Sequence, residues 1–179
     1  NTTGYQNTAV GWLALQDVNT GYSNTAIGES SGRNITSGFR NTFTGQRSGY
    51  TCTTGDYNQG LGSGSLYYLT TGDYNVAMGV NSCYKLTTNH GNVGIGHQAL
   101  FNNTSSYIVA VGMNSQYSNS TGLRNTSLGN ESMYGNTTAS GNTALGYQAM
   151  RTNTTGNENV AIGDRALYSV NGGSYNIAI

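Results

Sequence analysis

The side chains best suited to chemistry are two histidines and two neighbouring aspartates. Imidazoles such as His90 and His97 can act as a general base or bind a metal, and carboxylates such as Asp56 and Asp73 can share a cation. No Ser/His/Asp or Cys/His set recurs with them in a fixed spacing, which nucleophilic catalysis requires. The sequence therefore predicts no enzyme activity, no metal site and no bound cofactor.

Two further patterns touch on chemistry. Residues 60–64 read Gly-Leu-Gly-Ser-Gly and imitate a phosphate loop in their glycines, yet no helix follows to lend its dipole. Cys52 and Cys83 fall about two coils apart in the repeat of this chain, and about 4.8 Å per coil separates them too far for a disulfide. We expect Cys83 to be a buried small hydrophobic residue.

A repeat of 17 residues organises the whole chain. The segment GYQNTAVG at 4–11 returns as GYSNTAIG at 21–28 and as GNENVAIG at 156–163. Copies begin at residues 4, 21, 38, 55, 72, 89, 105, 122, 139, 156 and 173, and only the copy beginning at 89 has 16 residues. Such a period predicts stacked identical units in a single repeat domain over residues 1–179. Both ends cut through a repeat, so the chain is expected to be an excerpt of a longer one.

Each copy is numbered from position 1, its usual leading glycine, and the copies are called coils 1 to 11. Positions 3–7 and 10–13 predict two short strands, because β-branched residues favour strands and glycine turns end them. Helices are disfavoured, since Gly and Asn recur and no 3.6-residue apolar stripe survives. We expect an all-β fold, a parallel β-solenoid (β-roll) of about ten 17-residue coils with two short strands per coil. At about 4.8 Å per coil the rod would be about 48 Å long.

Stacking places like side chains on one another. Asparagines at position 4 are expected to form an amide ladder, and glycines at position 8 to hold a turn with positive φ. The ladder asparagines, interrupted by Ile108, are Asn7, Asn24, Asn41, Asn58, Asn75, Asn92, Asn125, Asn142, Asn159 and Asn176. The turn glycines are Gly11, Gly28, Gly45, Gly62, Gly79, Gly96, Gly112, Gly129, Gly146 and Gly163. The sequence leaves open whether positions 5 and 7 face the interior of the coil or a neighbouring chain.

The repeat also places the candidate chemical residues. His90 and His97 fall in two turns of one coil and are expected to be surface residues. Asp56 and Asp73 share position 2 of adjacent coils, about 5 Å apart by strand spacing. They would be either two solvated carboxylates or a pair bridged by a cation.

Position 13 carries an aromatic residue in six consecutive coils and again in coil 10. This aromatic strip consists of Tyr50, Tyr67, Tyr84, Phe101, Tyr117, Tyr134 and Tyr168. One interpretation is a stacked seam that packs on a turn or between chains. The other is an exposed strip that stacks on the sugar rings of a surface glycan receptor.

Asn-x-Ser/Thr motifs gather in one turn of the repeat. Nine occur, and the seven at positions 14 or 15 are Asn1, Asn34, Asn102, Asn103, Asn119, Asn136 and Asn153. If the source organism glycosylates surface proteins, this turn would carry a row of glycans along the rod.

Composition excludes several classes of protein. Charged residues make up 8% of the chain against about a quarter in ordinary globular domains, and the net charge is zero. Without a basic patch, nucleic acid is not expected as a ligand. No segment approaches the roughly 20 apolar residues that span a bilayer, and no signal peptide is present. We expect neither nucleic-acid binding nor membrane insertion.

The segment NTAVGWLAL at 7–15 recurs as NTALGYQAM at 142–150. This pattern resembles the repeats of phage and prophage tail-fibre proteins, and it is similar to the head repeats of trimeric autotransporter adhesins. The resemblance covers essentially the whole chain. It implies an extended β-solenoid, three parallel chains side by side, and display outside a cell or on a virion.

Three functional hypotheses remain open at this stage. The first is a structural shaft or display segment of an extracellular fibre, working as a homo-oligomer and contacting glycans if its sides bind anything. The second is a protomer of a self-assembling, glycan-coated extracellular fibril, because uncapped solenoid ends invite growth. The third is an ice-binding solenoid that uses threonine ladders at positions 5 and 16–17.

Overall fold

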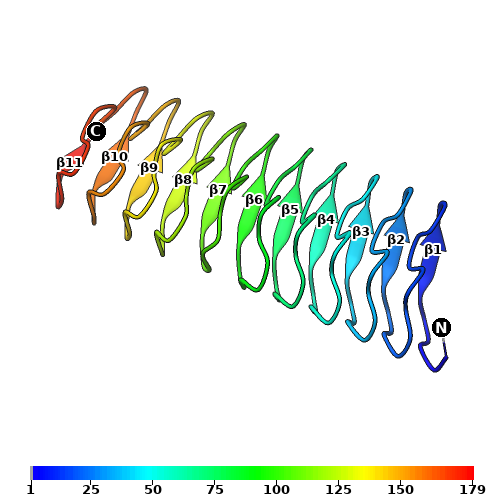
Figure 1. The fold of residues 1–179 in the computed structure, drawn as a ribbon. Helices are drawn as coiled ribbons and strands as arrows, with labels where there is room; N and C mark the ends of the chain where they lie inside the picture. The colour runs from blue at the N-terminus through cyan, green and yellow to red at the C-terminus, as the bar shows by residue number, and fades with distance from the viewer. Residues whose placement is uncertain (1) are drawn as a thin grey trace.

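The computed structural model describes residues 2–179, which form one rod of stacked coils (Figure 1). Its strands form a single 11-stranded parallel sheet in which each strand pairs with the next along the chain, so the expected all-β parallel solenoid is confirmed. The strands are β1 (Thr8–Val10), β2 (Thr25–Ile27), β3 (Thr42–Thr44), β4 (Gln59–Leu61), β5 (Val76–Met78), β6 (Val93–Ile95), β7 (Val109–Val111), β8 (Thr126–Leu128), β9 (Thr143–Leu145), β10 (Val160–Ile162) and β11 (Ile177–Ala178). Equivalent repeat positions stay paired even across the short coil, where Val93 lies opposite Val109.

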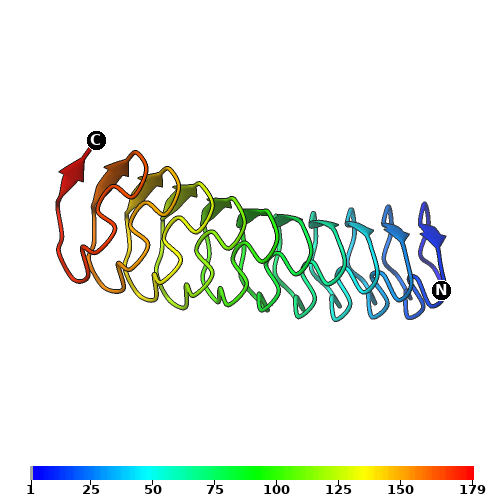
Figure 2. The ribbon, with the colours of Figure 1, turned by 90° about the horizontal axis from the view of Figure 1, so that it is seen from above.

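Each coil has one strand, so the expectation of a second strand at positions 10–13 is wrong. In all ten complete coils, positions 3, 10 and 12 have φ between +47° and +70°. A strand requires negative φ throughout, so left-handed residues such as Leu13 and Leu15 turn the chain instead. Backbone bonds still join neighbouring coils along this wall, for example from Leu66 N to Ser82 O at 3.0 Å. The strands line one wall of the flattened coil and the turns line the other (Figure 2).

The middle residue of each strand points into the rod. Position 6 is buried in nine strands, β2 to β10, while positions 5 and 7 of these strands are exposed or half-buried. Alternation along a strand sends neighbouring side chains to opposite faces. Positions 5 and 7 therefore form the outer face of the sheet and not the interior of the coil.

Phe43 is the one large residue at position 6, and three glycines make room for its ring. An added Cβ at Gly49 would lie 2.5 Å from Phe43 Cε2, one at Gly60 3.0 Å from Cδ1, and one at Gly32 3.2 Å from Cδ2. Gly32 and Gly49 occupy position 12, where the usual side chain is Leu or Met. The aromatic ring thus fills the volume left by glycines in its own coil and in the coil on either side of it.

This complementarity can be tested by a double-mutant cycle. Gly49→Leu should destabilise the protein by about 1–3 kcal/mol, because the added side chain overlaps the Phe43 ring. Combined with Phe43→Ala, the same leucine restores the ordinary pairing of alanine at position 6 with leucine at position 12, as in Ala9 and Leu15. We expect the double variant to unfold at higher denaturant concentration than the sum of the single losses predicts. Additive losses would show that the ring and the glycines do not share one space.

The buried interior divides into two apolar clusters. One extends from Leu15 to Ala110, and the other from Met133 to Ala161. Polar side chains lie between them, where Gln116 Nε2 donates to Ser127 Oγ at 2.9 Å and to Val109 O at 3.0 Å. Coils 7 and 8 are therefore joined by hydrogen bonds more than by apolar packing.

Candidate functional site

The position-4 asparagines form a continuous hydrogen-bonded column through the first six coils. Asn58 is representative: its N and Nδ2 donate to Asn41 Oδ1 at 2.9 and 3.1 Å, and Nδ2 also donates to Gly72 O at 2.8 Å. Its own Oδ1 accepts the same two bonds from Asn75, at 3.0 Å each. Because the column is fully buried from Asn24 to Asn92, each amide serves its neighbours and leaves no group for a ligand.

A second amide ladder takes over where Ile108 interrupts the first. Asn103 Nδ2 donates to Asn92 Oδ1 at 3.3 Å and to Ser105 O at 3.0 Å. Asn119 then donates to Asn103 at 2.7 Å, and Asn136 to Asn119 at 2.8 Å. These residues lie at position 15, which is apolar in coils 1 to 5 and asparagine in coils 6 to 9. Sequence reasoning missed this ladder, although the change of residue type beside Ile108 was its signal.

The expected glycan row is wrong at four of its five position-15 members. Asn103, Asn119, Asn136 and Asn153 are fully buried, and their Nδ2 atoms donate hydrogen bonds inside the rod. An N-linked glycan needs that same nitrogen at the surface, so the folded rod has no place for one there. Asn34 and Asn102 at position 14 are half-buried, and Asn1 lies outside the described residues.

The position-13 aromatic residues form a stacked column. From Tyr50 to Tyr134 consecutive ring centroids lie 5.0–5.2 Å apart with interplanar angles of 1–27°. Arg151 continues the column, with its guanidinium 5.0 Å from the Tyr134 ring centre and 6.0 Å from that of Tyr168. Ring faces inside the column are covered by their neighbours, so only edges and hydroxyls remain for a sugar.

Arginine at position 13 was not recognised from sequence as part of this column. Arg33 lies 5.9 Å from the Tyr50 ring centre and donates to its hydroxyl at 3.2 Å. Arg151 also donates from Nε to Glu131 Oε2 at 2.8 Å, and this bond lowers the pKa of the Glu131 carboxyl. A planar guanidinium stacks on an aromatic face much as another ring does.

The position-2 side chains hold the backbone of the preceding coil. Asp73 Oδ1 accepts from Asp56 N at 2.8 Å, and Asp56 Oδ1 accepts from Phe39 N at 2.9 Å. His90 Nδ1 accepts from Asp73 N at 3.0 Å. Partial burial is the main cause of the raised pKa of the Asp56 carboxyl, and the neighbouring Asp73 adds to it. The aspartates are therefore anchored to the backbone and not simply solvated.

Other candidate chemical residues are dispersed or inaccessible. His97 is exposed in another turn, and among residues 2–179 no three His, Cys, Asp or Glu side chains group closely enough to hold a metal ion. Cys52 and Cys83 are free and buried, and burial raises the pKa of both thiols to about 12. Because the thiolate is the reactive form, neither is suited to nucleophilic chemistry at neutral pH.

Threonine hydroxyls at position 16 are engaged within the rod. Thr53 Oγ1 donates to Thr70 O at 3.2 Å, and Thr70 Oγ1 donates to Thr87 O at 3.1 Å. Because these hydroxyls donate to backbone carbonyl oxygens of the rod, they do not form an array that is free to bind ice. Position 5 gives no unbroken array either, since Gln59 and then Val76 and Val93 follow Thr42.

The outer face of the sheet is an unusual surface for a face in contact with water. No charged residue occurs at positions 5 or 7 in any of the eleven strands. Apolar side chains are exposed along its length, including Val10 at 57%, Leu61 at 52% and Leu128 at 48%. A hollow of about 160 Å³ on this face is lined by Thr42, Thr44, Gln59, Gly60, Leu61 and Met78. We call this surface the sheet face.

In comparisons with protein families, curated proteins and solved structures, nothing matches this chain. Across residues 2–179 the structure has no helix with the length and apolar character needed to cross a membrane.

Proposed function

We propose that the chain is a structural segment of an extracellular or virion fibre, in which copies lie side by side through the sheet face. The observation that carries this proposal is the uncharged sheet face, with the row of apolar side chains that position 7 presents in every coil except at Thr44. Soluble monomers rarely expose contiguous apolar patches larger than a few hundred Å², and larger patches mark interfaces. The resemblance of the repeats to tail-fibre and adhesin repeats supports the same proposal.

The geometry of the sheet face favours a second copy of the chain as its partner. Side chains on this face recur once per coil, about every 4.8 Å along the rod. A surface with the same period can match it over its whole length, and another copy provides that surface. Most homo-oligomers have closed symmetry, and a ring of three parallel rods can bring their sheet faces together around one axis. The rod would then act mechanically, holding a binding end at a distance.

Light scattering with negative-stain imaging tests this proposal. We expect a defined mass near three chains, seen as short rods. The paired changes Leu61→Lys and Leu128→Lys place charges in the sheet face. They should yield folded monomers that keep the circular dichroism spectrum of the wild type but melt at a lower temperature, because they lose the stabilisation that assembly supplies. The matched control, Thr88→Lys with Thr138→Lys, alters exposed residues of a turn and should keep the assembly.

Two results would count against lateral association. A wild-type monomer at all concentrations would mean that the sheet face has no copy of this chain as partner. Long filaments of uniform width, unaffected by the lysines at Leu61 and Leu128, would indicate end-to-end growth and favour the fibril protomer.

A further inference from the structure

The position-3 side chains project from one edge of the rod, and two glycines interrupt their column. At Gly91 the gap is filled, since an added Cβ would lie 2.9 Å from the Tyr107 ring. At Gly141 the nearest atom to such a Cβ is Glu158 Cγ at 3.2 Å, and the next are backbone atoms at 3.9 Å. A hollow of about 500 Å³ lies here, lined by Arg124, Ser140, Gly141, Asn157, Glu158 and Tyr175.

The charged side chains of this hollow lack the partners that their counterparts have. Within residues 2–179, Arg33, Arg40, Arg47, Arg151 and Arg165 each pair with a carboxylate, an amide or an aromatic side chain. The Arg124 guanidinium has no such contact, and neither does the Glu158 carboxylate, unlike those of Glu29 and Glu131. The Arg124 guanidinium and the Glu158 carboxylate therefore line one hollow with opposite charges and, within residues 2–179, form no ion pair with each other. Both groups can bind a ligand that lies between them.

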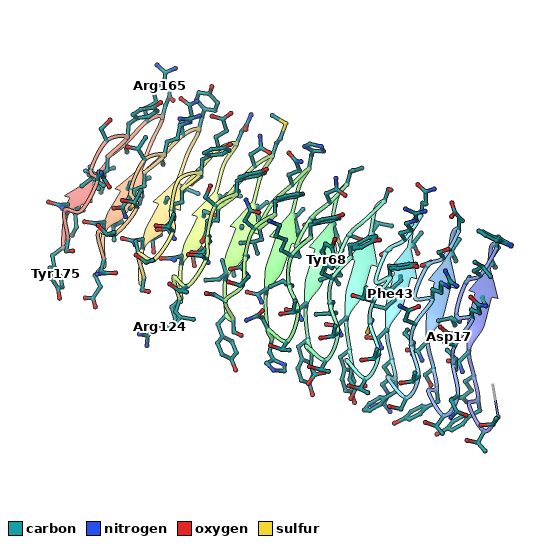
Figure 3. All side chains as sticks on the ribbon, in the orientation of Figure 1. Asp17, Phe43, Tyr68, Arg124, Arg165 and Tyr175 are labelled. Carbon is teal, nitrogen blue, oxygen red and sulfur yellow. The ribbon has the colours of Figure 1, made fainter. Side chains whose placement is uncertain are left out.

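Tyr175 supplies an aromatic surface at the end of the same hollow. It belongs to the last coil of these 179 residues, where it is 76% exposed, and it lines the hollow together with Glu158. Arg124 and Tyr175 project from the same edge of the rod, and Arg165 projects from the opposite one (Figure 3). Asn157 Oδ1 accepts from Ser140 N at 2.8 Å, which fixes the amide and leaves its NH₂ group as a donor.

We propose that the hollow over Gly141 is a carbohydrate subsite that takes one neutral hexose unit. Coils 8 and 10, which carry Arg124 and Glu158, are two strand spacings or about 10 Å apart. A sugar ring with hydroxyls on both sides spans this distance with a hydrogen bond of about 2.8 Å at each end. The guanidinium donates to hydroxyl oxygens, the carboxylate accepts from hydroxyl hydrogens, and Tyr175 offers its ring to the apolar face of the sugar.

The charge balance of the hollow argues against other small ligands. Glu158 repels the second charge of a phosphate or sulfate held by Arg124. Neutral polyhydroxyl compounds need both a donor and an acceptor and carry no charge to be repelled. This subsite does not depend on lateral assembly of the rod.

Calorimetric titration of the whole chain with methyl glycosides of glucose, galactose, mannose and N-acetylglucosamine tests the proposal. We expect at least one to bind, and oligosaccharides ending in that sugar to bind at least as well. Arg124→Gln, Tyr175→Ala and Gly141→Tyr, which fills the hollow, should each weaken binding about tenfold or more. The matched controls at the same repeat position, Arg40→Gln and Tyr107→Ala, should bind as the wild type does.

Three results would overturn the subsite. They are no binding of any glycoside at tens of millimolar, binding that survives Arg124→Gln and Tyr175→Ala, or equal losses in the controls. Melting temperatures of all variants would be measured alongside. If Gly141→Tyr unfolds the edge, Arg124→Gln still decides the outcome, because that exposed guanidinium makes no hydrogen bond or ion pair within residues 2–179 whose loss could destabilise the rod.

Discussion

Gly79→Ala is expected to destabilise the rod by more than about 3 kcal/mol, and Gly163→Ala by only about 1–2 kcal/mol. Both glycines occupy position 8 and have nearly the same backbone, with φ of +133° and +127°. At Gly79 an added Cβ would lie 2.5 Å from Gly96 O and 2.6 Å from Gly96 C. These 179 residues hold no position-8 residue in coil 11 to stack on Gly163, and the nearest atom there is Ala166 Cβ at 4.0 Å.

The two sites therefore separate conformational strain from stacking. A side chain at either glycine must accept a φ that L-residues rarely adopt, but only the methyl group at Gly79 meets the backbone of the next coil. Backbone atoms cannot move aside without separating two coils, so the overlap adds to the strain. Urea unfolding followed by circular dichroism measures both losses. Equal losses would mean that φ alone demands glycine, and a wild-type curve for Gly79→Ala would refute the turn.

Repetition is what made much of this fold predictable. A residue type that recurs at one position in nearly every coil must suit contact with itself, and this identified the Asn column and the position-8 turn. The left-handed residues at positions 10 and 12 could not be found in this way. Leu66 and Met133 adopt φ of +52° there, although nothing in the local preference of Leu or Met favours that region. Stacking of the coils overrides local preference at these sites.

Departures from the repeat were harder to interpret than the repeat itself. Phe43 departs from the small residues at position 6, and the glycines that make room for its ring lie in three coils, where no local sequence pattern links them to it. The motifs at Asn119 and Asn136 predicted glycan acceptors at the surface, because such a motif indicates a turn. The motif does not indicate which side chains of that turn are buried by the next coil. The hollow over Gly141 is also a departure, and it becomes visible only when the neighbours of each position are known in three dimensions.

Asn75→Leu is expected to destabilise the rod by about 3–5 kcal/mol, because several buried polar groups lose partners at once. Asn75 Nδ2 donates to Asn58 Oδ1 at 3.0 Å and to Asn89 O at 2.8 Å. Its Oδ1 accepts from N and Nδ2 of Asn92 at 3.0 and 3.1 Å. Leucine has the branched shape of asparagine, with two larger methyl groups in place of the amide oxygen and nitrogen, and it can replace none of these four bonds.

The control is Asn81→Leu, at a half-buried site in the turn at position 10. Leu13 occupies the equivalent position in coil 1 with φ of +59°, close to the +54° of Asn81. We expect a change within about 1 kcal/mol there. Equal melting temperatures for Asn75→Leu and Asn81→Leu would refute the stabilising role of the column.

The natural interruption at Ile108 suggests how the loss can be repaired. There Asn103, at position 15 of the preceding coil, donates to the oxygen of Asn92 that the missing asparagine would have used. The corresponding residue before Asn75 is Leu69. We therefore expect Leu69→Asn to destabilise the wild type but to recover at least about 1 kcal/mol in the Asn75→Ile background, a coupling typical of residues in contact. A higher free energy of unfolding in urea for the double variant than for Asn75→Ile alone would show that either ladder can stabilise the stacked coils. Additive losses would mean that coils 6 and 7 stay joined by other contacts, and that the second ladder follows from the stacking without stabilising it.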